Sequence, residues 1–382
     1  MPRPLGIGLI GQQFMGRAHS NAWGQVGKFF DLPVEPRLVA ISACDAATLA
    51  PFALRWGFER YTTDWKLLAN DPEIDLVDVA TPNHVHAEQA IAMLEAGKHV
   101  ACEKPLAGTL SDARAMRDAA RRAKQQHTFV WFNYRRCPAV GLAWGLIREG
   151  ALGRIYHVRA RYLQSWGGKE TPLLWRFKKG EAGSGAHGDL NAHSIDLARF
   201  LSGQEVVSVD GAAARTFIAR RKIPGTRKTG RSTVDDAVLF LATMSDGASA
   251  SFECSRVATG HFNDNTIELN GERGSVRFSF EDMNVLEYFD ATLPKGTQGW
   301  RRIMATTAGE HPYVASWWPQ AHLLGYEHGF VNMAADILKV LGRRRPELPL
   351  PDFADAYETQ RVLEAAMISA KERCAVPLRE VR

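Results

Sequence analysis

Short apolar runs alternate with helix-like patterns in the first third of the chain. Residues 88–96 and 111–124 repeat apolar side chains at helical spacing, and the runs between such stretches have the length of buried strands. This alternation is typical of strand–helix–strand units and predicts a parallel sheet. The predicted strands are residues 5–10, 38–43, 76–80, 99–102 and 129–132.

The pattern changes after residue 150, where longer runs alternate between apolar and polar positions. Turn-forming tripeptides at 245–247 and 270–272 separate some of these runs, which predicts an antiparallel sheet with hairpins. We therefore expect two domains, residues 1–133 and 134–382. The basic, Gly/Thr-rich residues 220–232 predict a mobile loop, and residues 352–373 a closing helix. The predicted strands are residues 155–163, 237–244, 248–254, 266–269 and 275–280.

Composition indicates a globular protein and argues against a nucleic-acid-binding or membrane-spanning one. At 382 residues and 45% apolar content the chain suits a two-domain globular protein. Its net charge of +5 is mild, and no basic run exceeds residues 343–345, which argues against nucleic acid as a partner. No apolar stretch approaches the roughly 18 residues of a membrane span, and the N-terminal pattern is not that of a signal peptide. Five scattered cysteines without a CxxC pair predict reduced thiols in a cytoplasmic protein.

A glycine-rich turn follows the first predicted strand. In a dinucleotide-binding turn the first glycine makes the bend, the second admits the pyrophosphate and the third allows close helix–strand packing. Gly11 and Gly16 stand at the first and third of these places, whereas Gln13 stands at the second, where a side chain should crowd the phosphates. Such turns also occur without a ligand, so the motif is weak by itself.

Asp45 ends the second predicted strand. A carboxylate there can accept a hydrogen bond from a ribose 2′-hydroxyl and repel a 2′-phosphate, which favours NAD over NADP. It lies 29 residues after Gly16, farther than the usual ~20, and residues 29–36 look like an inserted loop that explains the excess. The alternative is that Asp45 caps the following helix.

Two further strand ends carry polar residues. Thr81 and Asn83 follow the strand at 76–80, where an ordinary turn before a helix is the alternative interpretation. Glu103, Lys104 and Pro105 follow the strand at 99–102, and proline keeps the preceding Lys104 extended. Because open α/β sheets bind ligands at the carboxyl ends of their strands, Lys104 is well placed to act on a ligand.

A third polar cluster lies in residues 183–203, where a helix is expected from Asp189 to about Gly203. Asp189 and His193 are four residues apart on one face, and Asp196 follows three residues later. A carboxylate beside an imidazole suits acid–base catalysis near neutral pH. Three alternatives stay open: Asp189 caps the helix, His193 is a core histidine, or His187 joins these three residues around a metal.

The order and spacing of these motifs resemble the glucose-fructose oxidoreductase/inositol dehydrogenase/rhizopine-catabolism (Gfo/Idh/MocA) family over essentially the whole chain. The Cys-Glu-Lys-Pro segment and the Asp189-x-x-x-His193 pair are its most specific signals. The resemblance implies an α/β protein with an N-terminal Rossmann domain and a C-terminal α/β domain built on a large, mostly antiparallel open sheet. It also implies NAD as cofactor, no metal, and a homo-oligomer, dimer or tetramer, formed through that sheet.

The resemblance also implies roles for individual residues. The catalytic set would be Lys104, Asp189 and His193. The cofactor-binding set would be Gly11, Phe14, Met15, Gly16, Asp45, Thr81, Asn83, His86, Glu103, Lys104 and Asn133. The substrate-binding set would be Lys104, Tyr134, Gln164, Trp175, Arg176, Asp189 and His193, with Tyr326 and His328 as candidates for the rim of the site.

Segments 132–136, 162–166 and 174–177 resemble bacterial sugar dehydrogenases within the family. They imply oxidation of a pyranose hydroxyl at C3 to a ketone, with levoglucosan or a related anhydrosugar or glycoside as substrate. His187 and Asn191 depart from the small or apolar residues usual at their positions. The alternatives are a cyclitol such as inositol as substrate, reduction of a keto-sugar, a metal hydrolase, or a sugar- or NAD-sensing protein without catalysis; the presence of Lys104, Asp189 and His193 argues against the last.

Overall fold

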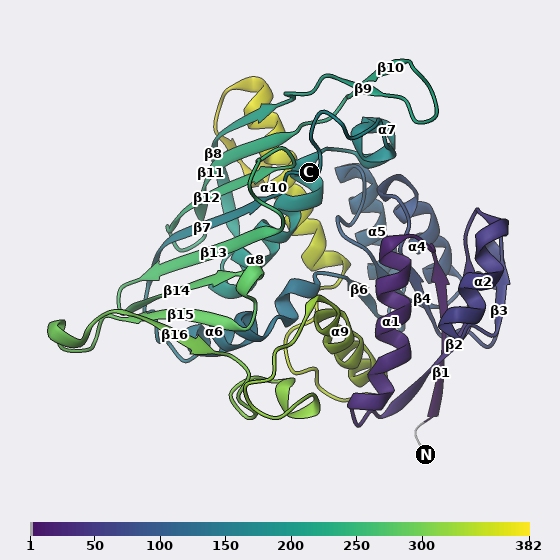
Figure 1. The fold of residues 1–382 in the computed structure, drawn as a ribbon, viewed down its shortest axis with the longest axis horizontal. Coiled ribbons are helices and arrows are strands. Elements are labelled where there is room, and N and C mark those ends of the chain that lie inside the picture. Colours follow the sequence, from purple (N-terminus) through teal and green to yellow (C-terminus); the bar gives the residue numbers. More distant parts are fainter. Residues whose placement is uncertain (1–2) are drawn as a thin grey trace. The chain divides into compact units, whose positions relative to one another are not determined.

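The computed structural model describes residues 3–382, which divide into two compact units (Figure 1). The first unit contains residues up to Arg136 together with 315–318 and 325–357. The second contains residues 137–314, 319–324 and 358–382. The chain thus returns to the first unit after residue 314, which the expectation of two continuous domains did not include.

The first unit is built on a six-stranded sheet in the order β3-β2-β1-β4-β5-β6, and every pairing in it is parallel. The order reverses between β1 and β4, the position at which sheets of this kind bind ligands. This sheet confirms the predicted Rossmann fold. Its strands are β1 (Arg3–Ile10), β2 (Val34–Ser42), β3 (Arg60–Thr62), β4 (Leu76–Val79), β5 (His99–Cys102) and β6 (Thr128–Val130).

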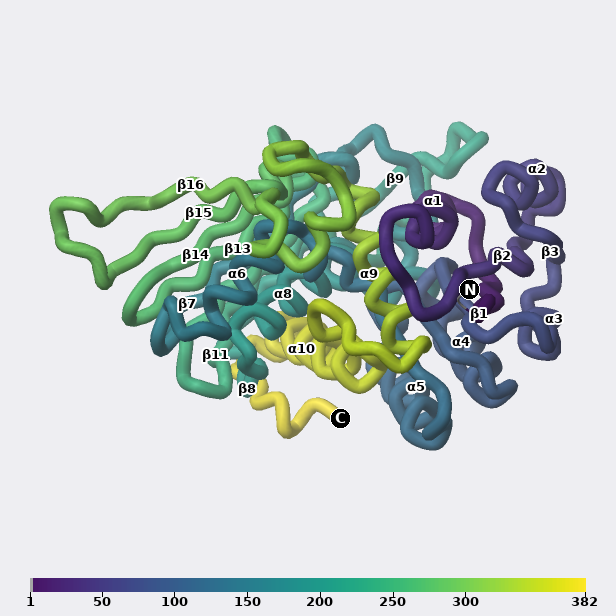
Figure 2. Tube along the Cα trace, turned by 90° about the horizontal axis from the view of Figure 1, so that it is seen from below, coloured from purple at the N-terminus to yellow at the C-terminus, as the bar shows by residue number. Residues whose placement is uncertain are grey.

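Helices cover both faces of this sheet. Figure 2 shows α1 on one side of the strands and α4 and α5 on the other. Helix α9 packs against α1, so a segment from late in the sequence completes the first face. The helices are α1 (Phe14–Phe29), α2 (Ala46–Trp56), α3 (Lys66–Ala69), α4 (His86–Glu95), α5 (Leu110–Arg122) and α9 (Tyr326–Leu341).

The second unit contains a nine-stranded open sheet in the order β16-β15-β14-β13-β7-β12-β11-β8-β17. Only β7 and β12 pair in parallel, so the sheet is mostly antiparallel, as predicted. Two short strands, β9 (Arg220–Lys222) and β10 (Thr229–Arg231), form a separate hairpin. The nine are β7 (Ile155–Leu163), β8 (Val206–Arg215), β11 (Ala237–Met244), β12 (Ser249–Ser255), β13 (Asp264–Gly271), β14 (Gly274–Ser279), β15 (Val285–Asp290), β16 (Trp300–Met304) and β17 (Val376–Pro377).

One face of the nine-stranded sheet is packed against helices. Helix α8 (Ala192–Ser202) contacts β7 and β13, and α6 (Pro138–Arg148) contacts β14 and β15. The alternating burial along β7 places every second side chain toward these helices, which is the pattern of a sheet with one buried face. Helix α7 (Lys179–Ala182) lies in the long connection before α8, and α10 (Phe353–Glu372) runs from residues of the first unit into the second.

Several local expectations were wrong. Residues 220–222 and 229–231 pair as the β9–β10 hairpin, so this segment is not the irregular loop that was expected. The connection between α1 and β2 has only four residues, so the long spacing from Gly16 to Asp45 comes from a 16-residue helix and a nine-residue strand. The sequence pattern missed β8, β15 and β16, whose mixed side chains do not alternate cleanly. Within residues 3–382 no helix is long and apolar enough to span a membrane.

Replacing Gly16 by alanine should destabilise the first unit. A Cβ at Gly16 would lie 2.3 Å from the carbonyl oxygen of Gly11, so the turn would have to move. We expect a loss of about 1–3 kcal/mol, the usual cost of overpacking. Gly24→Ala is the matched control, because it lies in the same helix and a Cβ there would meet nothing within 4 Å beyond the adjacent backbone of that helix, so it should gain about 0.5–1 kcal/mol. Urea denaturation of the two variants measures both changes, and an unchanged midpoint for Gly16→Ala would contradict the packing.

Candidate functional site

The turn between β1 and α1 requires its two outer glycines. Gly11 has φ of 117°, and a Cβ there would lie 2.4 Å from the carbonyl oxygen of Ala80 at the end of β4. Gly16 lies against the backbone of Gly11, as described above. The turn therefore brings the ends of β1 and β4 close together at the point where the strand order reverses.

The backbone of Gln13 does not adopt the left-handed conformation that favours glycine. Gln13 is the exposed N-cap residue of α1, with φ of −77°, and its side chain makes no capping hydrogen bond. The first turn of α1 contains no acidic residue. Amide groups at a helix N-terminus attract anions, so this end fits the pyrophosphate of a dinucleotide. Phe14 and Met15 follow in the same turn, and Phe14 is 53% exposed.

Asp45 caps helix α2. Its carboxylate accepts hydrogen bonds from the Ala47 amide (3.1 Å) and the Thr48 hydroxyl (2.6 Å). The Thr48 hydroxyl and the local amides lower the pKa of Asp45, so this exposed side chain is an anion at neutral pH. The capping role and a ribose-binding role are compatible, because a carboxylate has about four lone-pair directions.

The loop after β4 contains Thr81, Asn83 and His86. The Thr81 hydroxyl donates to Gln89 (2.7 Å), and Asn83 begins a short 3₁₀ turn. His86 is fully buried, with one ring nitrogen 2.9 Å from the Thr81 carbonyl and the other 3.2 Å from that of Pro105. The ring thus joins the loops after β4 and β5, and burial lowers its pKa.

Glu103 and Lys104 leave β5 through a cis peptide bond between Lys104 and Pro105. Glu103 is buried, whereas the Lys104 side chain is partly exposed. One Glu103 oxygen accepts the Lys104 amide (3.1 Å), and the other lies 3.0 Å from His19 of α1. His19 carries no motif signal beyond its place three residues after Gly16, and the sequence analysis missed it.

His19 is completely buried between acidic groups. Its Nδ1 lies 3.0 Å from Asp78 in β4, and its Nε2 faces Glu103. Burial alone would lower the pKa of His19, but the charges and hydrogen bonds of Asp78 and Glu103 outweigh it and raise the pKa to about 9. The two carboxylates thus favour the imidazolium form of the ring at neutral pH.

The second unit carries Asp189 and His193 where a π-helical turn (His187–Asn191) runs into α8. Such turns often occur at functional sites. Asp235 holds the start of this segment by accepting the amides of Gly185 (2.7 Å) and His187 (2.8 Å). Asp189 lies inside the turn, so the interpretation of it as a helix cap was wrong.

Arg256 is a second residue that the sequence analysis missed. Its buried guanidinium lies 3.0 Å from Asp189 and donates to the carbonyl oxygen of Arg176 (3.0 Å). It also lies 5.2 Å from the centre of the Trp166 ring. Arg256 therefore joins three segments of the second unit and keeps a positive charge beside Asp189.

His187 has a structural role in this fold. Asn191 donates to its Nδ1 (3.0 Å), so Nε2 carries the proton and donates to the carbonyl oxygen of Leu363 (2.9 Å). Burial lowers the pKa of His187 and keeps it neutral. No three His, Cys, Asp or Glu side chains between residues 3 and 382 are grouped as metal ligands.

Polar and aromatic side chains gather at the end of β7. Gln164 donates to Asn263 (2.7 Å) and accepts from the Trp166 indole (2.6 Å), and the Tyr162 hydroxyl also donates to Asn263 (2.6 Å). The Tyr162 ring lies 5.8 Å from that of His193. The structure thus brings Gln164 and His193 into one cluster around Tyr162, and Asn263 is another residue that the sequence analysis missed.

The remaining predicted residues take varied positions. The Arg176 guanidinium lies 4.4 Å from the centre of the Trp175 ring, and both side chains are half-buried. Asn133 and Tyr134 begin the 3₁₀ turn Asn133–Arg136 of the first unit, each with only 4% of its surface exposed.

The two rim candidates, Tyr326 and His328, lie in the first turn of α9. The Tyr326 ring stacks on Phe14, with 6.1 Å between centres, and His328 accepts the Gly325 amide (2.9 Å). The stacking connects the start of α9 to the first turn of α1, where the dinucleotide-type turn ends.

Two family models match the chain. Residues 5–132 match the oxidoreductase family with an NAD-binding Rossmann fold, and residues 142–277 match the GFO/IDH/MocA C-terminal domain. Both matches fall where the fold contains the corresponding sheets.

Similar proteins cover the whole chain. It is 39% identical to levoglucosan dehydrogenase from Pseudarthrobacter phenanthrenivorans, over 99% of each chain. A solved structure of levoglucosan dehydrogenase with NADH and levoglucosan superimposes with a TM-score of 0.93 at 40% identity, over 98% of this chain and 99% of that one. An oxidoreductase domain protein from Kribbella flavida gives 0.94 at 47% identity, over 99% and 100%.

Proposed function

The chain belongs to the GFO/IDH/MocA family of NAD-binding oxidoreductases, and we propose that it oxidises a hydroxyl of a pyranose-type sugar. The proposed substrate is levoglucosan or a related anhydrosugar or glycoside, oxidised at C3 to a ketone. The observation that carries the proposal is the end-to-end similarity to levoglucosan dehydrogenase together with the presence of Lys104, Asp189 and His193.

His193 is the proposed general base, which removes the proton of the reacting hydroxyl. Neutral imidazole suits this step near pH 7. Asp189, kept beside the Arg256 guanidinium, would orient His193 or accept a hydrogen bond from the neighbouring sugar hydroxyl. Lys104 would donate a hydrogen bond to the reacting oxygen and stabilise the negative charge that develops on it.

The nicotinamide of bound NAD⁺ would accept the hydride from the same sugar carbon. The first unit has the features that such a cofactor needs: a backbone turn closed by Gly11 and Gly16, an α1 N-terminus without a side-chain cap, and a charged Asp45. The proposed contacts also include Phe14, Met15, Thr81, Asn83, Glu103, Lys104 and Asn133, with His86 acting through the two loops that it joins.

Trp175 and Tyr134 would cover the C–H surfaces of the sugar, and Gln164 and Arg176 would hydrogen-bond its hydroxyls. The cluster of Gln164, Tyr162 and Asn263 supports this proposal because it offers several donors and acceptors within one hydrogen-bonded group. Tyr326 and His328 remain candidates for the rim. The five cysteines are free thiols, which fits a reducing compartment, and we propose the cytoplasm.

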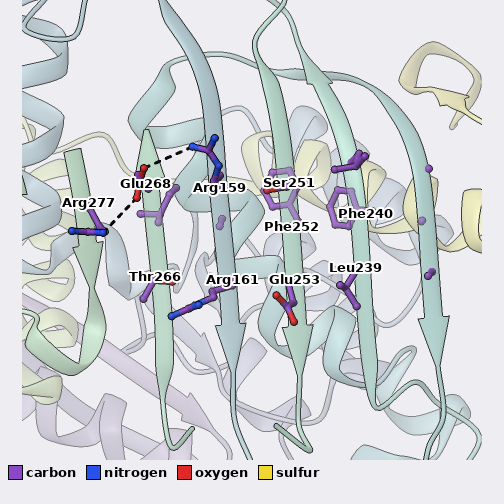
Figure 3. Close-up of a pocket in the computed structure, with 16 residues that line it drawn as sticks. Arg159, Arg161, Leu239, Phe240, Ser251, Phe252, Glu253, Thr266, Glu268 and Arg277 are labelled. Carbon is purple, nitrogen blue, oxygen red and sulfur yellow. Dashed lines mark ion pairs between the residues drawn. The ribbon is translucent and has the colours of Figure 1, made fainter. Parts of the chain in front are cut away.

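We also propose that the open sheet mediates homo-oligomerisation. Its helix-free face presents Leu239 and Leu241 of β11, which are 45% and 60% exposed. Figure 3 shows Leu239 beside Glu253, with Arg161, Arg159, Glu268 and Arg277 on the strands beyond it. Glu268 lies between Arg159 and Arg277, at 3.7 and 3.8 Å, so charges of both signs alternate across the strands. A surface of this mixed character can complement a second copy of itself.

The catalytic proposal predicts sugar-dependent reduction of NAD⁺. The purified protein should raise absorbance at 340 nm with levoglucosan, and a panel of pyranoses, glycosides and inositols defines its range. His193→Ala should lower kcat by about 10²–10⁴-fold, the usual contribution of a general base. Lys104→Ala should lower it by about 10²–10³-fold, as loss of a fixed donor does.

The His193→Ala variant should bind NAD⁺ as tightly as the wild type, to within about threefold, by tryptophan fluorescence, whereas Lys104→Ala also removes a proposed contact to the cofactor. His187→Asn is the control, because this buried histidine bonds only within the fold. If the protein oxidised only inositols, or only reduced keto-sugars with NADH, the proposed pyranose substrate would be wrong. Binding of NAD⁺ without turnover in either direction would favour a sensor.

Asp45 should determine the choice between NAD and NADP. Asp45→Asn removes the charge that repels a 2′-phosphate but keeps a good helix cap. We expect it to lower the ratio of kcat/KM for NAD over NADP by about tenfold or more, with little change in melting temperature. Asp45→Ala should also lose the cap, about 1 kcal/mol. An unchanged cofactor ratio in Asp45→Asn would exclude this role.

Substitution on the open sheet face should change the assembly. The wild type should sediment as a dimer or tetramer, whereas Leu241→Glu should form smaller species because it buries a charge in the contact. Leu54→Glu is the control, since Leu54 is 85% exposed on α2 of the other unit. Analytical ultracentrifugation at micromolar concentration measures each state, and a monomeric wild type would refute the interface.

A further inference from the structure

The buried ring of His19 lies between two carboxylates of the first unit. Its Nδ1 is 3.1 and 3.0 Å from the two oxygens of Asp78, and its Nε2 is 3.0 Å from Glu103. A neutral imidazole has one N–H and would direct the lone pair of its other nitrogen at a carboxylate. An imidazolium donates at both nitrogens, so the geometry together with the negative charge of the two carboxylates favours the charged form.

Asp78 is held in place by more than His19. The indole of Trp23 donates to one of its oxygens (2.7 Å) and the indole of Trp131 to the other (2.8 Å). The Trp131 ring also lies 4.3 Å from the centre of the His19 ring. With Asp78 fixed by two indoles and His19 fixed by Asp78, the remaining N–H of His19 has one defined direction, toward Glu103.

Glu103 connects the fixed His19 ring to the backbone of Lys104. The oxygen that does not face His19 accepts the backbone amide of Lys104, and the Glu103 amide donates to the carbonyl of Val79 (2.8 Å). On the far side of Lys104, His86 contacts the carbonyls of Pro105 and Leu106 at 3.2 and 3.3 Å. The backbone of Lys104 is thus held on one side through His19 and on the other through His86.

We infer that His19 is a positioning residue for Lys104: as an imidazolium bridging Asp78 and Glu103, it orients the Glu103 carboxylate, which fixes the Lys104 backbone. The inference rests on the proposed catalytic role of Lys104. It concerns a residue of α1 that touches neither sugar nor reacting oxygen. Its contribution is geometric, and small displacements of a catalytic group cost up to about 10²-fold in rate.

His19→Gln tests the inference, because glutamine can donate to one carboxylate but supplies no charge between two. We expect kcat with levoglucosan and NAD⁺ to fall about 10–100-fold, while the Kd of NAD⁺ changes less than threefold. Glu103→Gln should give a loss of similar size. His311→Gln is the control: this histidine is also buried, but burial lowers its pKa to about 4 and it lies in the second unit.

A double-mutant cycle separates positioning from general destabilisation. Once Lys104 is replaced by alanine, its backbone position no longer affects a side-chain amine, so adding His19→Gln should lower kcat by less than about twofold. An equal loss in both backgrounds would refute the inference and leave the catalytic proposal intact. An unimpaired Lys104→Ala variant would instead refute the catalytic proposal, and the inference with it.

A measurement on the wild type remains decisive even if His19→Gln does not fold. Histidine ¹⁵N chemical shifts distinguish an imidazolium from a neutral ring, and Glu103→Gln identifies the signal of His19 by shifting it. We expect an imidazolium at pH 8, where an ordinary histidine is neutral. A neutral ring at that pH would overturn the inference.

Discussion

The first unit depends on one buried positive charge between two negative ones. Asp78, Glu103 and His19 come from β4, the end of β5 and α1, so this ion cluster joins the three elements that surround the dinucleotide-type turn. Removing charges from water costs several kcal/mol for each ion, and only close opposite charges with good hydrogen bonds compensate for it. The arrangement therefore has few alternatives: a shift of α1 or of either strand would leave a carboxylate buried without its partner.

The second unit also contains buried ion pairs, in which the positive groups are arginine guanidiniums. Arg256 pairs with Asp189, and Arg221 pairs with Asp236 at 3.1 Å in a fully buried bridge. Asp235 accepts two amides ahead of the π-helical turn, so the segment that contains His193 is held through both charge and backbone. The candidate catalytic residues of each unit are thus held by buried groups that do not themselves face solvent.

The nine-stranded sheet has one buried face and one exposed face. Helices α6 and α8 bury one face, and the other face keeps leucines and charged pairs at the surface. A sheet of this size does not need a second helical layer to fold, because antiparallel sheets can be covered on one side only. The uncovered face is then available for association, while the polar ends of its strands supply the cluster around Gln164 and Tyr162.

The sequence by itself determined the strands and helices with regular periodicity and the division into a parallel and an antiparallel sheet. It also identified candidate site residues by their type and spacing, such as Gly11, Gly16, Lys104 and the Asp189–His193 pair. Only the tertiary structure revealed His19, Arg256, Asp235 and Asn263, and showed that His187 is structural. Their partners lie far away in the chain: His19 and Glu103 are 84 residues apart, and Arg256 and Asp189 are 67. Local periodicity reports which face of an element is buried, but it does not report which distant charge that face will meet, because that depends on how the elements pack.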